Sequence, residues 1–153
     1  MTSAARGFHT GLKSFVQYYG GQEVDASLLL MPIVGFLPIT DPRVAATIKR
    51  IERELMDDGL VYRSMQSRQG SQGAFLACSC WLADCRRMQG RISEARAAFE
   101  RLLEVRNDVG LLSEEYDIRG RHLSGNFPQA LSHLGVVTTA LELSGPTLGR
   151  GAD

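Results

Sequence analysis

The stretch GAFLACSCWLADCRRMQGRISEARAAFERLL, residues 73–103, decides the fold that the sequence predicts. Between Gly73 and Met88, apolar residues recur at helical spacing and cover a broad face, which is typical of a helix buried on more than one side. A second helix begins near Ser93, with small and apolar residues on one face and charged residues on the other. The linker at residues 89–92 is so short that the two helices must form an antiparallel hairpin.

The segments on either side of this hairpin also read as helices. Asp41 can cap a helix that has Pro42 at its first position, and the Asp58-Gly59 pair is expected to end it. A shorter helix is expected at residues 24–34, and a last helix runs from Pro128 to the Gly145-Pro146 pair. No alternating strand pattern of any length is present. We therefore predict an all-α fold of five or six helices.

Composition bounds the classes of function. The chain has 153 residues, enough for one domain, and its 17 Lys and Arg balance its 17 Asp and Glu. A nucleic-acid-binding protein needs a basic surplus, so we expect no nucleic-acid partner. The longest apolar run, near residues 28–37, contains Pro32 and Gly35 and is too short to cross a membrane. Residues 1–11 hold no apolar core of a signal peptide, so we expect no membrane partner and a cytoplasmic location.

The three cysteines, Cys78, Cys80 and Cys85, lie within one short segment. An odd number of thiols on one helix does not make a disulfide framework, and a reducing compartment fits them. A zinc site would need a fourth nitrogen or sulfur ligand, which this spacing does not supply. We expect small, buried core residues and no metal.

Arrays of helical hairpins form either an open solenoid or a closed α/α toroid. Residues 90–100 look like half of a tetratricopeptide unit, but no similarity at a 34-residue period surrounds them. The toroid is therefore the predicted architecture, and the solenoid is the structural alternative. The Gly- and Pro-containing segment 145–153 is expected to be a disordered tail.

The chemistry is expected in the two long connections, residues 61–72 and 107–127. The second contains Leu111-Leu112-Ser113-Glu114-Glu115-Tyr116-Asp117, with three carboxylates in four positions. Crowded carboxylates can raise one another's pKa, and glycoside hydrolysis needs two carboxyl groups. On spacing alone, a solvated acidic turn is the other interpretation.

At this point the sequence resembles a known family. Residues 113–117, followed by Gly125-Asn126-Phe127-Pro128-Gln129-Ala130-Leu131-Ser132-His133, are similar to the C-terminal part of glycoside hydrolase family 15, the glucoamylases and glucoamylase-like trehalases. Three further stretches agree in the same order. They are residues 15–20 leading into 24–32, residues 35–38 followed by 41–43, and residues 73–79 preceding 81–84. The resemblance runs from about Phe15 to Leu143.

The resemblance implies an (α/α)6 barrel that hydrolyses α-glucosidic bonds with inversion. It implies that Glu114 is the general base, with Glu115 beside it, and that Arg63 binds sugar hydroxyls. Gln72 stands where relatives usually have a glutamate, so it keeps hydrogen bonding at that sugar contact but loses the charge. Acid–base chemistry suffices for this reaction, so no metal or organic cofactor is expected.

The same resemblance implies an incomplete site. The family's general acid lies upstream of the segment that begins at Phe15, and nothing in this chain matches it. We therefore expect residues 1–144 to form roughly half of the barrel and to be inactive alone. The expected partners are an α-glucoside, either a glucan or trehalose, and a separate N-terminal half or a second copy. The alternative is a non-catalytic helical-hairpin module that binds a protein, in which Glu114 and Arg63 need not share a pocket.

Other aromatic and histidine side chains carry weaker expectations. His133 and Trp81 are expected to be packed residues of their helices. The tyrosines either line a sugar cleft or pack, and they are Tyr18, Tyr19 and Tyr62.

Overall fold

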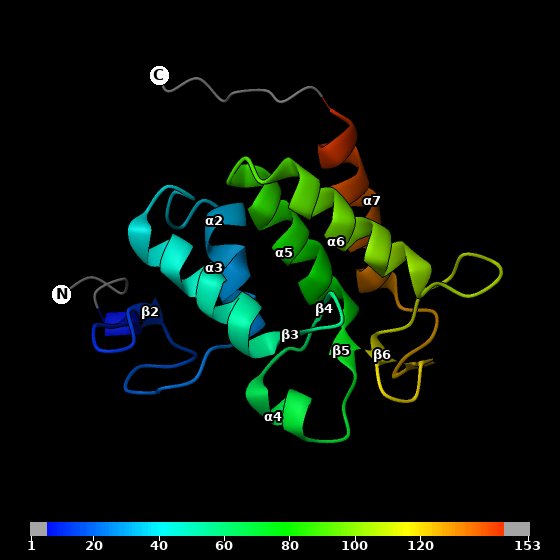
Figure 1. Ribbon diagram of the computed structural model, residues 1–153, viewed down its shortest axis with the longest axis horizontal. Helices are drawn as coiled ribbons and strands as arrows, with labels where there is room; N and C mark the ends of the chain where they lie inside the picture. Colours follow the sequence, from blue (N-terminus) through cyan, green and yellow to red (C-terminus); the bar gives the residue numbers. More distant parts are fainter. Residues whose placement is uncertain (1–5, 146–153) are drawn as a thin grey trace.

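The computed structural model describes residues 6–145 and confirms a mainly helical chain (Figure 1). Its helices are η1 (Ala26–Leu29), α2 (Leu30–Ile33), α3 (Pro42–Leu55), α4 (Met65–Gln69), α5 (Leu76–Met88), α6 (Ile92–Glu104) and α7 (Ala130–Ser144). Short antiparallel strands join them: β1 (Phe8–His9) pairs with β2 (Ser14–Phe15), and β3 (Met56–Asp57) with β4 (Leu60–Val61). A three-stranded sheet has the order β5 (Ala74–Phe75), β6 (Glu115–Asp117), β7 (His122–Ser124). Apart from Gly145, the predicted tail lies outside the described residues.

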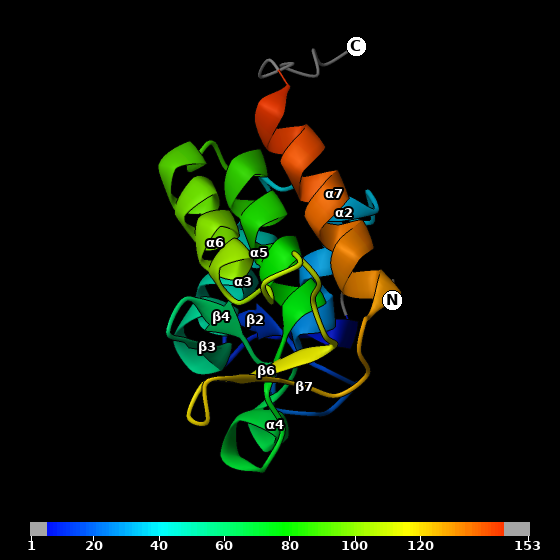
Figure 2. The same ribbon diagram turned by 90° about the vertical axis from the view of Figure 1, so that its right-hand side faces the viewer.

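Helix α5 is the centre of the fold. It forms the predicted antiparallel hairpin with α6, and α7 packs on its other side, so that α5 lies between the two (Figure 2). One cluster of buried residues joins α5 to η1 and α3, and a second joins it to β4, α6 and Leu112. The broad apolar face predicted for α5 is therefore covered from several directions, as its composition requires.

Helix α3 begins as predicted and ends earlier than predicted. The Asp41 carboxylate accepts a hydrogen bond of 2.9 Å from the Arg43 N–H, and Pro42 occupies the first position. The helix ends at Leu55, because the next two residues pair with β4. The Asp58-Gly59 pair, expected to stop the helix, is instead the turn of this hairpin, with φ of 44° and 76°.

Two further boundaries differ for a similar reason. The helix expected from Gly73 starts at Leu76, since Ala74 and Phe75 pair with Tyr116 and Glu115 of β6. The helix expected at residues 24–34 is divided into η1 and α2. Strands of two or three residues are too short to show an alternating pattern, so no local pattern predicted them.

The cysteines are buried core residues, as predicted. Cys78, Cys80 and Cys85 are buried and free, and burial raises the pKa of Cys80 and of Cys85 to about 12. Within residues 6–145, no group of three His, Cys, Asp or Glu residues is arranged to hold a metal ion. No helix in this range has the length and apolar character needed to cross a membrane.

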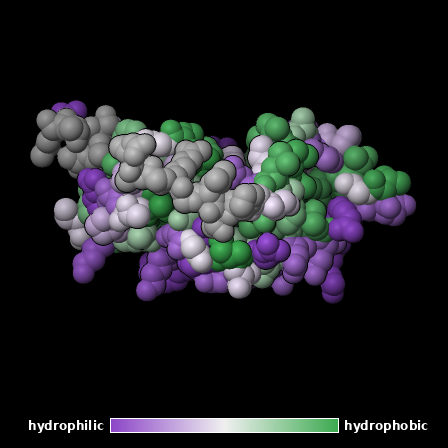
Figure 3. Space-filling model, turned by 90° about the horizontal axis from the view of Figure 1, so that it is seen from above, coloured by the Kyte–Doolittle hydropathy of each residue, from purple (hydrophilic) through white to green (hydrophobic). Residues whose placement is uncertain are grey.

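The two sides of the helical layer differ in polarity. Seen from above, hydrophilic side chains line the lower long edge of the view, while apolar patches lie toward the upper edge (Figure 3). Helix α7 contributes four large apolar side chains that are 42–68% exposed, and they are Leu131, Leu134, Val137 and Leu141. This uncovered face carries the large apolar side chains of α7, whereas the residues that α7 buries are small or polar.

Candidate functional site

The predicted site residues lie at one end of the helical layer, where chain segments enter η1, α5 and α7. Strand β5 leads directly into α5, and β6, which carries Glu115, pairs with it. Arg63 follows β4, and its carbonyl accepts a hydrogen bond of 2.8 Å from the Ala26 N–H at the start of η1. In Figure 1, α4, β5 and β6 mark this end at the bottom of the view.

Glu114 is held by its backbone and by one carboxylate oxygen. Its N–H donates to the Asn126 carbonyl (2.9 Å), and its carbonyl accepts from the Leu76 N–H (3.1 Å). The Asn126 N–H donates to Oε2 of the carboxylate (3.2 Å). Within residues 6–145 no other group hydrogen-bonds to this carboxylate, and the side chain is half-buried. A carboxylate so placed has acceptor capacity left for a water molecule.

The Glu115 side chain reaches the residue that follows Gln72, just before β5. The Gly73 N–H donates to Oε2 of Glu115 at 3.0 Å. The side-chain carbonyl of Gln72 accepts a hydrogen bond of 2.7 Å from the hydroxyl of Ser67, in α4. Gly73 permits this approach, because a Cβ there would lie 2.6 Å from the Tyr116 carbonyl oxygen.

Arg63 is exposed and tied to a buried carboxylate. Its side chain is 59% exposed, and its Nε lies 3.5 Å from Oδ2 of Asp25. Asp25 is 4% exposed and also caps η1, accepting a hydrogen bond of 2.8 Å from the Ser27 N–H. The pairing of Asp25 with Arg63 was not predicted from the sequence, because the two residues belong to segments far apart along the chain.

The structure joins some of the predicted residues and not others. Glu114, Glu115 and Gln72 share the β5–β6 region, whereas no hydrogen bond or ion pair within residues 6–145 links Arg63 to any of them. Two surface hollows, of about 590 Å³ and 240 Å³, are lined by other residues. The common pocket for Glu114 and Arg63 therefore stays a prediction.

Three side chains with weaker expectations have clear places. His133 is half-buried, accepting a hydrogen bond from the Leu112 N–H at Nε2 (3.3 Å) with Nδ1 2.7 Å from the Gln129 carbonyl oxygen. Trp81 packs against the first core cluster. Tyr62 is 4% exposed, and burial raises the pKa of its hydroxyl. The packed interpretation is confirmed for all three.

One carboxylate outside this region has an unusual environment. Burial between α5 and α7 raises the pKa of Asp84 from near 4 to about 6, against the opposing effects of Thr139 and Arg87. By contrast, the backbone N–H groups of Gly120 and Arg119 hold the pKa of Asp117 below its usual value. Asp117 therefore stays ionised and shapes the turn between β6 and β7.

Comparison with known proteins places this geometry in context. The model of the family described as glycosyl hydrolases family 15 matches residues 2–141. The trehalase of Thermoplasma acidophilum is 46% identical over 148 residues, which are 95% of this chain and 26% of that trehalase. The trehalase of Mycobacterium tuberculosis is 41% identical over 135 residues, or 84% of this chain and 20% of that protein. The chain thus spans about a quarter of the length of these curated relatives.

Solved structures share the fold. A wild-type glycosidase superposes with a TM-score of 0.82 at 22% identity, covering 92% of this chain and 40% of that chain. A variant of that glycosidase in complex with glucose gives the same TM-score at 21% identity. The predicted helical class is confirmed by this likeness. The matched region is 40% of the solved glycosidase chain, so that chain extends beyond the part that resembles this one.

Proposed function

Because this chain belongs to glycosyl hydrolase family 15, we propose that it supplies the general-base part of the active site of an inverting α-glucosidase. The base is Glu114, and Arg63, Gln72 and Glu115 contact the sugar. The curated relatives are named trehalases, which makes trehalose the first substrate to test. The glycosidase class rests on the family, and the assignment of these four residues is the proposal.

The proposal rests on the hydrogen bonding and the burial of the Glu114 carboxylate. One oxygen accepts from the Asn126 N–H, which fixes the side chain, and the group is half-buried at the end of the helical layer. A general base must accept a proton from a water molecule that it also orients. Glu114 would deprotonate the water that attacks the anomeric carbon, on the side of the sugar opposite the leaving group, so that the configuration inverts.

Arg63 is suited to hold the sugar while this happens. Its guanidinium has five N–H donors, and Nε of the exposed side chain lies 3.5 Å from Oδ2 of Asp25. The remaining donors form a planar fork that matches two neighbouring hydroxyls. Gln72 offers an amide, with its carbonyl already engaged by Ser67, so its N–H groups are the part left to donate to a sugar hydroxyl.

The general acid and the remaining pocket are expected from a further part of a family 15 polypeptide. Inversion requires a second carboxyl group about 6.5–9.5 Å from the base. The uncovered apolar face of α7 supports the presence of additional helices at this layer, since such a face is normally packed. Closure of these helices into an (α/α)6 ring is part of the proposal.

Complementation tests the proposal. Glucose release from trehalose and from maltose is measured with this chain alone. The assay is then repeated with the chain mixed with the part of the Thermoplasma acidophilum trehalase that precedes the matched region. We expect hydrolysis only in the mixture, and Glu114→Gln should lower it by about 10²–10⁴-fold because a concerted proton transfer is lost.

The matched control is Glu100→Gln, which makes the same change at an exposed position of α6 and should leave the rate unchanged. Full activity with Glu114→Gln would overturn the assignment of the base. Tight association of the two parts with no hydrolysis of either sugar would instead favour a protein-interaction module.

A further inference from the structure

His133 joins the start of α7 to the segment that leads into Glu114. Its Nε2 accepts a hydrogen bond of 3.3 Å from the Leu112 N–H, and its Nδ1 lies 2.7 Å from the Gln129 carbonyl oxygen, one turn earlier along the chain. A backbone N–H can only donate, so Nε2 must carry a lone pair, and a carbonyl can only accept, so Nδ1 must carry the hydrogen. One form of the ring satisfies both contacts, the neutral imidazole with its hydrogen on Nδ1.

The backbone that precedes Glu114 is bound to the start of α7 at two further polar groups. The Leu112 carbonyl accepts a hydrogen bond of 2.9 Å from the Gln129 N–H. The Ser113 carbonyl accepts one of 2.7 Å from the Ser132 hydroxyl. Leu112, Ser113 and Ser132 are 0–2% exposed. Because a buried polar group that loses its partner costs free energy, these contacts define where the segment lies.

The carboxylate of Glu114 depends on this segment for its position. The Glu114 N–H and one carboxylate oxygen both meet the backbone of Asn126, and the Glu114 carbonyl accepts from the Leu76 N–H of α5. Helix α5 thus holds the residue itself, while α7 holds the chain directly before it. Precision matters at this place, since a displacement of about 1 Å can cost a catalytic group about 10²-fold in rate.

From this geometry we propose that His133 is a positioning residue for Glu114, acting through the Leu112 N–H. The inference rests on the proposed role of Glu114 as the general base, and it adds the side chain that holds this base in place. A residue that only packs needs bulk, whereas a positioning residue needs a hydrogen-bond acceptor at the place of Nε2. The two roles therefore predict different outcomes when the ring is replaced.

Two variants separate the two nitrogen positions of the ring. The longer glutamine side chain brings an amide oxygen near the place of Nε2, whereas the shorter asparagine brings its amide near the place of Nδ1. His133→Gln therefore keeps an acceptor for the Leu112 N–H. His133→Asn keeps only the contact with the Gln129 carbonyl, although both variants remove the ring.

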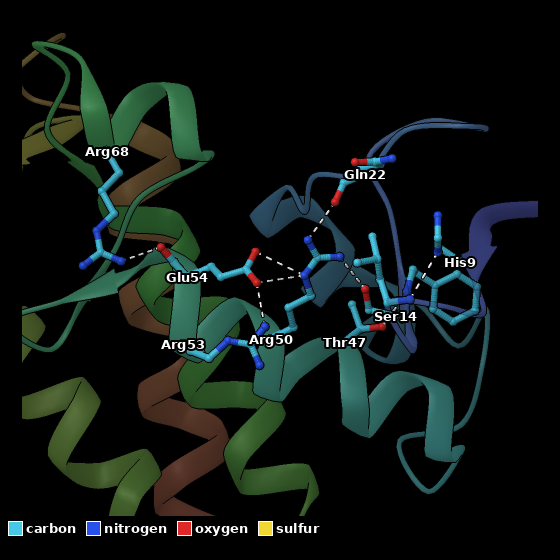
Figure 4. A network of polar contacts seen from close by, with 10 residues as sticks. His9, Ser14, Gln22, Thr47, Arg50, Arg53, Glu54 and Arg68 are labelled. Carbon is cyan, nitrogen blue, oxygen red and sulfur yellow. Dashed lines mark hydrogen bonds and ion pairs between the residues drawn. The ribbon is translucent and has the colours of Figure 1, made fainter.

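The matched control is Thr47 of α3, which lies in the polar network shown in Figure 4. Its hydroxyl donates to the Arg43 carbonyl one turn earlier (2.7 Å) and accepts from the Phe15 N–H of a distant segment (2.9 Å). Arg50 ties the same segment to α3 by donating to the Ser14 hydroxyl at 2.8 Å. None of the four proposed site residues lies on this segment. Thr47→Val thus removes a buried hydrogen bond of the same kind without touching the proposed base.

NMR of the isotope-labelled full chain tests the inference without catalysis. The ring nitrogen signals of His133 should be those of the neutral form with its hydrogen on Nδ1. The Asn126 N–H donates to the Glu114 carboxylate at 3.2 Å, so its signal should shift as that carboxylate takes up a proton in acid. His133→Asn should reduce this shift by about half, since hydrogen bonds weaken steeply as their geometry worsens. His133→Gln and Thr47→Val should keep it.

Kinetics of the complemented mixture give a second readout. With the preceding part of the Thermoplasma acidophilum trehalase, His133→Asn should lower kcat for trehalose about tenfold and leave KM unchanged, because a displaced base slows the chemical step and not binding. His133→Gln should restore most of this loss, and Thr47→Val should match the wild type.

Three outcomes would overturn the inference: a ring hydrogen on Nε2, an unchanged Asn126 response in His133→Asn, or equal losses of kcat in the two His133 variants. A mixture that hydrolyses neither sugar would contradict the proposed function instead. The ring and amide signals would then still decide whether His133 holds Glu114 in place.

Discussion

Helices α3 and α7 are nearly equal in length and opposite in how they bury their side chains. Helix α3 turns its large apolar residues inward, with Val44, Ile48, Ile51 and Leu55 all at 0–1% exposure. Helix α7 buries small or polar residues, Ser132, Gly135 and Thr139, and leaves its large apolar residues exposed. Gly135 shows why, because a Cβ there would lie 2.9 Å from the Cys80 sulfur of α5.

The difference shows that the apolar residues of α3 are fully packed within residues 6–145, whereas those of α7 are not. Helix α3 has one apolar stripe and one charged face, so a single layer of neighbours satisfies it. Helix α7 approaches α5 closely through its small residues, and its large residues point away, toward a second neighbour that residues 6–145 do not provide. An apolar helix with one covered face is typical of an element that lies between two layers.

The largest expected effect compares the same kind of truncation in the two helices. Ile51→Ala in α3 should lower the free energy of unfolding by about 2–5 kcal/mol, since it removes a fully buried side chain and leaves a cavity. Leu134→Ala in α7 should change it by less than about 0.5 kcal/mol, because this side chain is 61% exposed. Urea denaturation measures both. Equal losses would mean that the α7 face is covered in solution.

The next effect concerns pH. Because the pKa of Asp84 is raised to about 6 by burial beside α7, the folded chain binds this proton more tightly than the unfolded chain does. The stability that protonated Asp84 contributes is present below about pH 4 and is lost as pH rises through about 6. After allowance for partial exposure, the loss is of the order of 1–2 kcal/mol.

Asp84→Asn isolates this contribution, since the amide mimics the protonated carboxyl. The variant should gain stability relative to the wild type between pH 4 and 7, as measured by urea denaturation at several pH values. At the start of α3 the sign is opposite, because the Arg43 side chain lowers the pKa of Asp41 and its stabilisation is lost in acid. A difference between Asp84→Asn and wild type that does not vary with pH would contradict the burial of Asp84.

The smallest effect compares the N-cap residues, which directly precede the two helices. Asp41→Ala should cost about 1 kcal/mol, because the aspartate accepts the Arg43 N–H at 2.9 Å. Gln129→Ala at the start of α7 should cost less, since its amide oxygen lies 3.4 Å from the Leu131 nitrogen and glutamine is a poor cap. Thermal unfolding resolves the two, and a larger loss for Gln129→Ala would reverse the comparison.

Much of the helical fold was predictable from local signals. The cap at Asp41, the hairpin of α5 and α6, and the burial of the three cysteines follow from spacing within one segment. The end of α3 and the start of α5 were predicted wrongly, since strand pairing competes there with helix propensity. For α5 the pairing partner lies about forty residues away, so no window of local sequence contains it.

The candidate site was likewise predicted in its local parts and not in its long-range contacts. The Ser113–Asp117 motif drew attention to Glu114 and Glu115, and the structure places both next to β5. The bond from the Asn126 N–H to Glu114 and the pairing of Asp25 with Arg63 were not predicted, because each joins segments separated by a turn or by several elements. The hydrogen bonds that Arg50 donates to the Ser14 hydroxyl and to the Gln22 carbonyl were also not predicted, because they too join segments far apart along the chain.

The sequence by itself determined the helical class, the family, and the residue types available for acid–base chemistry, because periodicity, caps and motifs are local properties. Only the tertiary structure decided which face of α7 is left uncovered, which carboxylate has its pKa raised to about 6, and how Arg50 ties Ser14 and Gln22 to α3. These properties depend on burial and on contacts between distant segments. Desolvation and close packing exist only when the chain has brought those segments together.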